Sequence, residues 1–207
     1  VQCREIQVYG NQQSEGMSRK TDEQFFAFAN GIAHEDKDGK YVFEKVNELG
    51  VVTHNHMNYY LPAFSTIYAG SGRQSDKYEL ISQLTYDDIP AGKQVSFEKW
   101  ASLMDKVYKI NDNGKWAIVF ALMCAFRSNI HCLDRLFTAP FFMGPMSSGK
   151  TQIAISIRSL FISPTIPIFN LNTGTDAAMS TMMGTFRDVP VVLDEYNNKD
   201  ISDTKFQ

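Results

Sequence analysis

Short runs of aromatic and β-branched residues fill the first ninety positions of the chain, and turn-forming residues separate them. Two of these separators are the pairs Asn30-Gly31 and Asp38-Gly39. Such pairs between apolar runs are typical of β-hairpins, so residues 1–90 are predicted to form a small antiparallel sheet. The strand candidates lie at 25–29, 32–34, 41–46, 50–52 and 57–61.

The hydrophobic pattern changes after a segment at 87–92 that is rich in turn-forming residues and typical of a linker. Between positions 97 and 108, apolar residues recur every three or four positions, which predicts an amphipathic helix with Ser96 as its N-cap. Residues 115–128 are apolar nearly all round and predict a second, central helix. The sequence therefore predicts a helical segment over residues 94–134.

Strand-like and helix-like patterns alternate over residues 135–207. Residues 152–161 predict one helix, and a second is expected to begin after Thr175 as its N-cap. Helices that alternate with strands favour a mostly parallel sheet. The predicted fold class is therefore α/β, with the β-rich region and the helical segment preceding it. The strand candidates of this third region lie at 137–143, 165–170 and 189–193.

A glycine-bounded loop directly follows the first of these strand candidates. Glycines let backbone N–H groups turn inward around phosphates, where a side chain would obstruct their approach. Lys150 would bring a positive charge to the β- and γ-phosphates, and the Thr151 hydroxyl would ligate Mg²⁺. A surface loop could match by accident, but a strand candidate precedes this loop and a helix candidate follows it. The loop reads Gly144-Pro145-Met146-Ser147-Ser148-Gly149-Lys150-Thr151, a complete G-x-x-x-x-G-K-T pattern.

The apolar run at 189–193 ends in the acidic pair Asp194-Glu195. Open α/β sheets place ligand chemistry at the carboxyl ends of their strands. There Asp194 could hold Mg²⁺ beside the phosphates, and Glu195 could orient or deprotonate the attacking water. Because strands often end in charged residues, the acidic pair alone is weak evidence for a site. The phosphate loop earlier in the chain is what favours a magnesium site at this pair.

Together these strings carry a resemblance to a known family. GPMSSGKT and VPVVLDEY resemble the Walker A and Walker B motifs of the additional-strand, catalytic-glutamate division of P-loop NTPases. The adjacent Asp-Glu and the short interval resemble AAA+ and superfamily 3 helicase-like ATPases. The string FANGIAHEDKDGKYVFEKVNELGVV resembles the strand-rich segment ahead of the ATPase core in primase-helicase-like proteins of phages and mobile elements.

The resemblance implies a role for each matching residue. Residues 144–151 would bind the triphosphate of ATP, with Lys150 on the terminal phosphates. Thr151 and Asp194 would serve Mg²⁺, and Glu195 would polarise the water for hydrolysis. The implied function is ATP hydrolysis in a DNA replication helicase or primase-helicase. Its partners would be single-stranded or duplex DNA and further copies of the chain in a ring.

The chain stops at Gln207, soon after the acidic pair. The sensor residue, the remaining central strand and the arginine finger of the resembled families are absent from it. We therefore expect the front half of an ATPase core, truncated within a larger protein, over residues 135–207, and its autonomous catalysis is in doubt. Two other classes stay open. One is a P-loop enzyme that is not a helicase, such as a kinase or signalling ATPase. The other is a module in which nucleotide stabilises an assembly without turnover.

Composition limits the partners and the compartment. Twenty basic and twenty-three acidic side chains give a net charge of −3, which excludes a generally basic nucleic-acid binder but not a local DNA-contacting loop. The longest apolar run, 116–126, has 11 residues, against the roughly 20 that a membrane-spanning helix needs. No signal peptide is visible either. We expect a cytoplasmic protein with no membrane contact.

The cysteines and histidines offer weaker candidates for chemistry. Cys3, Cys124 and Cys132 are odd in number and form no CxxC pair, which indicates reduced thiols rather than disulfides or a zinc site. His54 and His56 lie two apart on a predicted strand and would project to one face, as metal ligands can. The sequence shows no third ligand for them, so polar surface histidines are the favoured interpretation.

Overall fold

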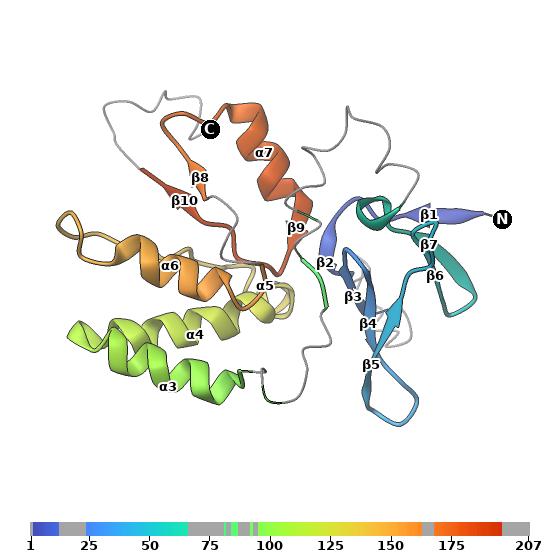
Figure 1. Ribbon diagram of the computed structural model, residues 1–207, viewed down its shortest axis with the longest axis horizontal. Helices are drawn as coiled ribbons and strands as arrows, with labels where there is room; N and C mark the ends of the chain where they lie inside the picture. Colours follow the sequence, from blue (N-terminus) through green and yellow to red (C-terminus); the bar gives the residue numbers. More distant parts are fainter. Residues whose placement is uncertain are drawn as a thin grey trace. The chain divides into compact units, whose positions relative to one another are not determined.

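The structure is a computed structural model that divides into two compact units (Figure 1). The first unit comprises Val1–Asp87 and Gly184–Arg187, and the second comprises Asp88–Met183 and Asp188–Gln207. A short segment from late in the chain thus belongs to the N-terminal unit. The residues described are 2–12, 24–65, 81, 84–86, 92, 95–162 and 168–195.

A five-stranded mixed sheet forms one half of the first unit, in the order β5-β4-β3-β2-β9. The pairs from β2 to β5 are antiparallel, whereas β9 adds to β2 in parallel. Gly10 faces Arg187 across that parallel pair, and a Cβ atom at Gly10 would overlap the Arg187 carbonyl oxygen. The strands are β2 (Tyr9–Asn11), β3 (Phe25–Phe28), β4 (Gly31–Glu35), β5 (Tyr41–Lys45) and β9 (Phe186–Arg187).

A three-stranded sheet, in the order β1-β7-β6, forms the other half. Strands β6 (Val51–His54) and β7 (Met57–Tyr60) make an antiparallel hairpin, and β1 (Cys3–Glu5) pairs with β7 in parallel. The hairpin turns at Asn55 and His56, which have φ angles of 47° and 64°. Two successive left-handed residues are what a type I′ turn requires, and its twist matches that of the flanking strands. A 3₁₀ turn, η2 (Pro62–Phe64), follows.

Apolar side chains from both sheets form the core of the first unit. Tyr9, Ile32 and Leu61 are completely buried. Phe25 on β3 meets Tyr59 on β7 edge to face, with ring centroids 4.8 Å apart. Such aromatic pairs add about 0.5–1.5 kcal/mol beyond the burial of their area. The N-terminal region is β-rich, as predicted, but the single small antiparallel sheet is wrong. The strands form two sheets, and the pairs β1–β7 and β2–β9 are parallel.

Three helices make up the core of the second unit. Helices α3 (Phe97–Val107), α4 (Asn113–Ala125) and α6 (Lys150–Arg158) lie side by side (Figure 1). Trp100 donates from its indole N–H to the carbonyl oxygen of Ser156, 3.3 Å away, and so ties α3 to α6. Their shared buried cluster consists of Met104, Ala117, Ala121, Ile153 and Ile157.

Several shorter elements complete the second unit. The 3₁₀ turn η4 (Ile110–Asp112) connects α3 to α4, and α5 (Arg127–Asp134) follows α4 after a break at Phe126. Helix α7 (Asp176–Thr185) follows β8 (Phe169–Asn170), which pairs in parallel with β10 (Leu193–Asp194).

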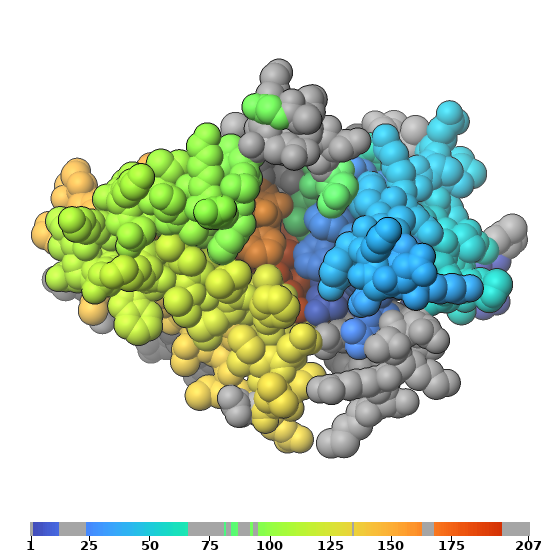
Figure 2. Space-filling view, turned by 90° about the horizontal axis from the view of Figure 1, so that it is seen from below, coloured from blue at the N-terminus to red at the C-terminus, as the bar shows by residue number. Residues whose placement is uncertain are grey.

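Helices α3, α4 and α5 form a continuous surface of the second unit, green to yellow in Figure 2. Several apolar side chains of α4 are exposed, among them Trp116, Val119 and Leu122. By length and composition, no single helix in the described ranges could cross a membrane, although the bent pair 110–125 and 127–133, at 79° to each other, passes that test together.

The predicted α/β class with a mostly parallel P-loop sheet is wrong. Over the residues that the structure describes, the sheets are antiparallel or mixed apart from the two-residue pair β8–β10, and no parallel-dominated core forms. The predicted strand at 137–143 is absent. Pro140 lies at its centre and has no N–H to donate to a sheet, and Met143 is 80% exposed. Pro190 interrupts the run at 189–193 in the same way.

Two sequence predictions concern segments that lie wholly or partly outside the described residues. The predicted linker at 87–92 lies outside the described residues except for Gly92, and the predicted strand at 165–170 is described only from residue 168 onward.

Candidate functional site

The predicted phosphate loop, residues 144–151, leads directly into helix α6. Gly149 is the N-cap of that helix with a φ of 85°, and no side chain caps it. Only glycine adopts this left-handed conformation without steric cost. The first turn of α6 therefore presents backbone N–H groups and the positive end of the helix dipole to whatever occupies the loop, an arrangement that suits an anion.

The Lys150 ammonium is held over the loop. Its Nζ donates to the carbonyl oxygens of Gly144 and Pro145, at 3.0 and 2.7 Å, and lies 3.5 Å from Ser148 Oγ. These partners are neutral oxygens, and a phosphate would be a stronger acceptor because it carries a full charge. Met146 and Ser147 at the tip of the loop are exposed; Met146 is 94% exposed, and Ser147 has a left-handed backbone with a φ of 61°.

Asp194 reaches the start of the same helix. Thr151 donates from its hydroxyl to Asp194 Oδ2, 3.2 Å away, although the two residues lie 43 positions apart in the chain. Asp194 holds this position at the end of β10, where it pairs with Asn170 of β8. A hydroxyl and a carboxylate are hard oxygen donors of the kind that Mg²⁺ prefers, so the residues present fit this ion.

Glu195 follows β10 and is exposed. Its backbone adopts a φ of 62°, and its N–H donates to Asp194 Oδ1 at 3.0 Å. The left-handed backbone turns the chain directly after Asp194, so the two carboxylates do not continue along one strand. The structure thus brings Thr151 into contact with Asp194. Lys150 and Glu195 are the chain neighbours of these two residues.

A cavity of about 360 Å³ adjoins the loop. That volume lies within the range of roughly 300–1,000 Å³ that is typical of small-molecule sites. Its lining comes from the end of α3, the turn before α4, the start of α4 and the segment 141–150, together with Ile153 of α6. The lining residues are Tyr108, Ile110, Asn111, Asn113, Phe141, Phe142, Met143, Gly144, Pro145, Ser148, Gly149, Lys150 and Ile153.

The histidine pair predicted to share a strand face is not a pair. His56 lies in the hairpin turn and is exposed, whereas His54 closes β6 and is only 8% exposed. His54 instead lies against His34 of β4, with ring centroids 4.3 Å apart. Sequence reasoning missed His34 and Glu44. A signal was available, because a hairpin turning at 36–40 sets His34 opposite Val42 and so brings Glu44 to the same face.

Searches of protein-family models, of curated proteins and of solved structures found no match for this chain.

Proposed function

We propose that this chain binds ATP with Mg²⁺ at residues 144–151 and hydrolyses it. The observation that carries the proposal is the Thr151 hydroxyl 3.2 Å from the Asp194 carboxylate, at the N-terminus of the helix that begins with Lys150. A cation, a hydroxyl and a carboxylate converge there on an uncapped helix end. Nucleotide binding and hydrolysis at this site require these groups and the loop, and they do not require a mostly parallel sheet.

Each residue has a defined task in this proposal. Thr151 and Asp194 would hold Mg²⁺, which when bound neutralises charge on the phosphates. Lys150 exchanges its carbonyl contacts for the terminal phosphates, and the first turn of α6 donates N–H groups to them. Glu195 orients the attacking water and accepts its proton. The adjoining cavity offers Tyr108 and Phe142 as apolar surfaces for the nucleoside.

The wider role proposed is that of a DNA replication helicase or primase-helicase in the cytoplasm. The support is the resemblance of GPMSSGKT and VPVVLDEY to Walker motifs, together with the N-terminal string. DNA and further copies of this chain in a ring are the partners that this role requires. With a net charge of −3, a local surface rather than the overall charge must contact DNA.

Calorimetric titration with ATP and Mg²⁺ tests the binding step. The chain is expected to bind ATP, and Lys150→Ala is expected to abolish measurable binding, because the phosphates lose their principal cation. Lys99→Ala is the matched control, since Lys99 is an exposed lysine in the first turn of α3. An ATP affinity that is the same in the unmodified chain and in the Lys150→Ala variant would contradict the proposed nucleotide site.

Turnover separates the proposal from its alternatives. Glu195→Gln is expected to keep ATP affinity and to lose hydrolysis, whereas a module without turnover would be unaffected. Single-stranded DNA is expected to raise the hydrolysis rate if the enzyme is a helicase. A kinase or signalling ATPase would hydrolyse ATP at the same rate with and without DNA.

A further inference from the structure

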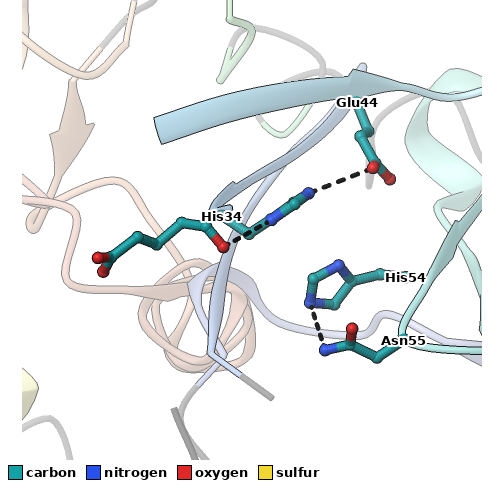
Figure 3. A network of polar contacts seen from close by, with 5 residues as sticks. His34, Glu44, His54 and Asn55 are labelled. Atoms are coloured by element: carbon teal, nitrogen blue, oxygen red, sulfur yellow. Dashed lines mark hydrogen bonds and ion pairs between the residues drawn. The ribbon is translucent and has the colours of Figure 1, made fainter. Parts of the chain in front are cut away.

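Three metal-ligating side chains gather where the two sheets of the first unit meet (Figure 3). His34 comes from β4, Glu44 from β5 and His54 from the end of β6. One ligand atom from each lies within 4.8 Å of the other two. The proposed nucleotide site uses none of these residues, so the cluster calls for its own explanation.

Strand register places the three residues together. In the β4–β5 pair, Ile32 faces Glu44 and His34 faces Val42, so His34 and Glu44 are diagonal neighbours on one face. Phe25 lies directly opposite His34 on β3 and contacts the His54 ring edge to face, with centroids 5.6 Å apart. The type I′ turn that follows His54 ends its strand at this point. The backbone of both sheets therefore holds the cluster.

Hydrogen bonding leaves a lone pair of His34 facing a carboxylate. His34 Nδ1 lies 3.1 Å from the carbonyl oxygen of Glu35, which can only accept, so Nδ1 carries the proton. In the neutral ring, Nε2 then has a lone pair, and it lies 3.3 Å from Glu44 Oε1. Among the residues that the structure describes, this buried Nε2 has no hydrogen-bond partner. Two acceptors at this distance repel each other, and either a proton on Nε2 or a metal ion bound by both atoms removes the repulsion.

His54 supplies a second imidazole of the right kind. Its Nε2 lies 3.1 Å from the Asn55 amide nitrogen, and its other ring nitrogen, Nδ1, points toward His34 and Glu44 (Figure 3). Burial lowers the pKa of His54, the neighbouring His34 lowers it further, and Glu44 opposes them. A neutral imidazole is the form that ligates a metal. In this orientation the Asn55 amide donates to Nε2, which puts the proton of a neutral ring on Nδ1. Turning the amide over lets Nε2 donate to the amide oxygen and frees Nδ1 for the metal.

We propose that His34, Glu44 and His54 bind one Zn²⁺ ion, with a fourth position open to water. Two imidazoles and one carboxylate suit zinc, whereas Ca²⁺ and Mg²⁺ require more oxygen ligands than this cluster offers. Zinc bonds of about 2.0–2.2 Å set tetrahedral ligand atoms about 3.4 Å apart. The His34–Glu44 distance of 3.3 Å already has this value. The other two pairs need to close by at most about 1.4 Å, within reach of side-chain rotation.

Zinc titration of the metal-free chain tests the site. The chain, cleared of metal with a chelator, is titrated with Zn²⁺ in competition with a chromophoric chelator, and one equivalent is expected to bind. Glu44→Gln and His34→Gln are each expected to lower the zinc affinity at least about 100-fold, because each removes a direct ligand. Glu44→Gln is close in shape and its side chain is 40% exposed, so the fold is expected to survive it.

Matched controls identify the ligands. His56→Asn removes the neighbouring exposed histidine, keeps a residue that tolerates the left-handed turn, and is expected to leave the zinc affinity unchanged. Cys132→Ser is expected to do the same. Replacing zinc by Co²⁺ should give the strong visible absorption of a tetrahedral site, and Glu44→Gln should lose it.

Two results from the variants would overturn the proposal. One is a zinc affinity that is the same in the chain, in Glu44→Gln and in His34→Gln, which would leave the cluster as a protonated His34–Glu44 ion pair. The other is an affinity that falls equally in His56→Asn or Cys132→Ser, which would place the ion elsewhere. Zinc is also expected to raise the unfolding temperature of the unmodified chain and a chelator to reverse this, and an unfolding temperature unchanged by zinc would contradict the site without any variant.

Discussion

Cys124 illustrates how burial decides the chemistry of a single side chain in this protein. Its thiol is only 4% exposed on α4, whereas Cys3 and Cys132 are exposed. Burial raises the pKa of Cys124 to about 12, the nearby Asp188 charge adds to the shift, and Arg127 opposes it. Because the thiolate is the reactive species, Cys124 is expected to be inert at neutral pH.

Alkylation with iodoacetamide at pH 8 measures this difference. Two thiols of the folded chain are expected to react rapidly and the third only after denaturant is added. The same pKa shift has a consequence for stability. The folded pKa of about 12 exceeds the ordinary value of 9.0, so unfolding releases a proton between those pH values. The free energy of unfolding is expected to fall by about 1.4 kcal/mol per pH unit in that window through this group.

Cys124→Ala tests the assignment of that slope, and Cys132→Ala is its matched control. The first variant is expected to lose this contribution to the alkaline decline in urea unfolding, and the second to keep it. An equal alkaline slope in Cys124→Ala and in the unmodified chain would show that other groups cause the decline.

At the scale of elements, local signals in the sequence were reliable where nothing opposed them. Ser96 caps α3 as predicted, with its Oγ accepting from the Lys99 N–H at 3.2 Å, and Thr175 Oγ1 accepts from the Ala178 N–H at the start of α7. Apolar runs separated by turn-forming residues also predicted the strands from β3 to β7. The failures occurred where proline interrupts an apolar run, at Pro140 and Pro190, because the missing N–H outweighs the hydrophobic pattern.

Strand β9 could not be predicted from local pattern at all. It has two residues, Phe186 and Arg187, and it pairs with β2 from the opposite end of the chain. Its position depends on long-range pairing, for which a single sequence carries no periodic signal. The glycine that permits this pairing, Gly10, has a φ of 104°.

Gly10→Ala is expected to destabilise the chain by about 2 kcal/mol or more. The added Cβ overlaps the Arg187 carbonyl oxygen and also strains a left-handed backbone. Gly184→Ala is the matched control, because a Cβ there meets nothing within 4 Å, and in helix α7 the change is expected to be neutral or slightly stabilising. Thermal unfolding compares the two variants, and equal unfolding temperatures would contradict the close approach of β2 and β9.

At the scale of the whole molecule, the two proposed sites differ in how far the sequence foretells them. The phosphate loop is a contiguous motif, so its residues were predictable, and so was the meeting of Thr151 with Asp194 as an expectation from resemblance. The cluster of His34, Glu44 and His54 draws on three strands and two sheets, and only the register brings it together. A contiguous motif is visible in a sequence as a whole, whereas a site assembled by pairing is visible only in part: the β4–β5 hairpin sets His34 and Glu44 on one face, but nothing local brings in His54.

Because the two sites belong to different units, each ligand is expected to protect a different part of the chain from hydrogen exchange. Zinc should slow exchange in β4, β5 and β6, and ATP with Mg²⁺ should slow it in residues 144–158. Glu44→Gln should remove only the first effect and Lys150→Ala only the second. Mass spectrometry of peptides from each unit reads both out in one experiment. Protection that survives in the corresponding variant would contradict that site alone, so the two proposals stand or fall separately.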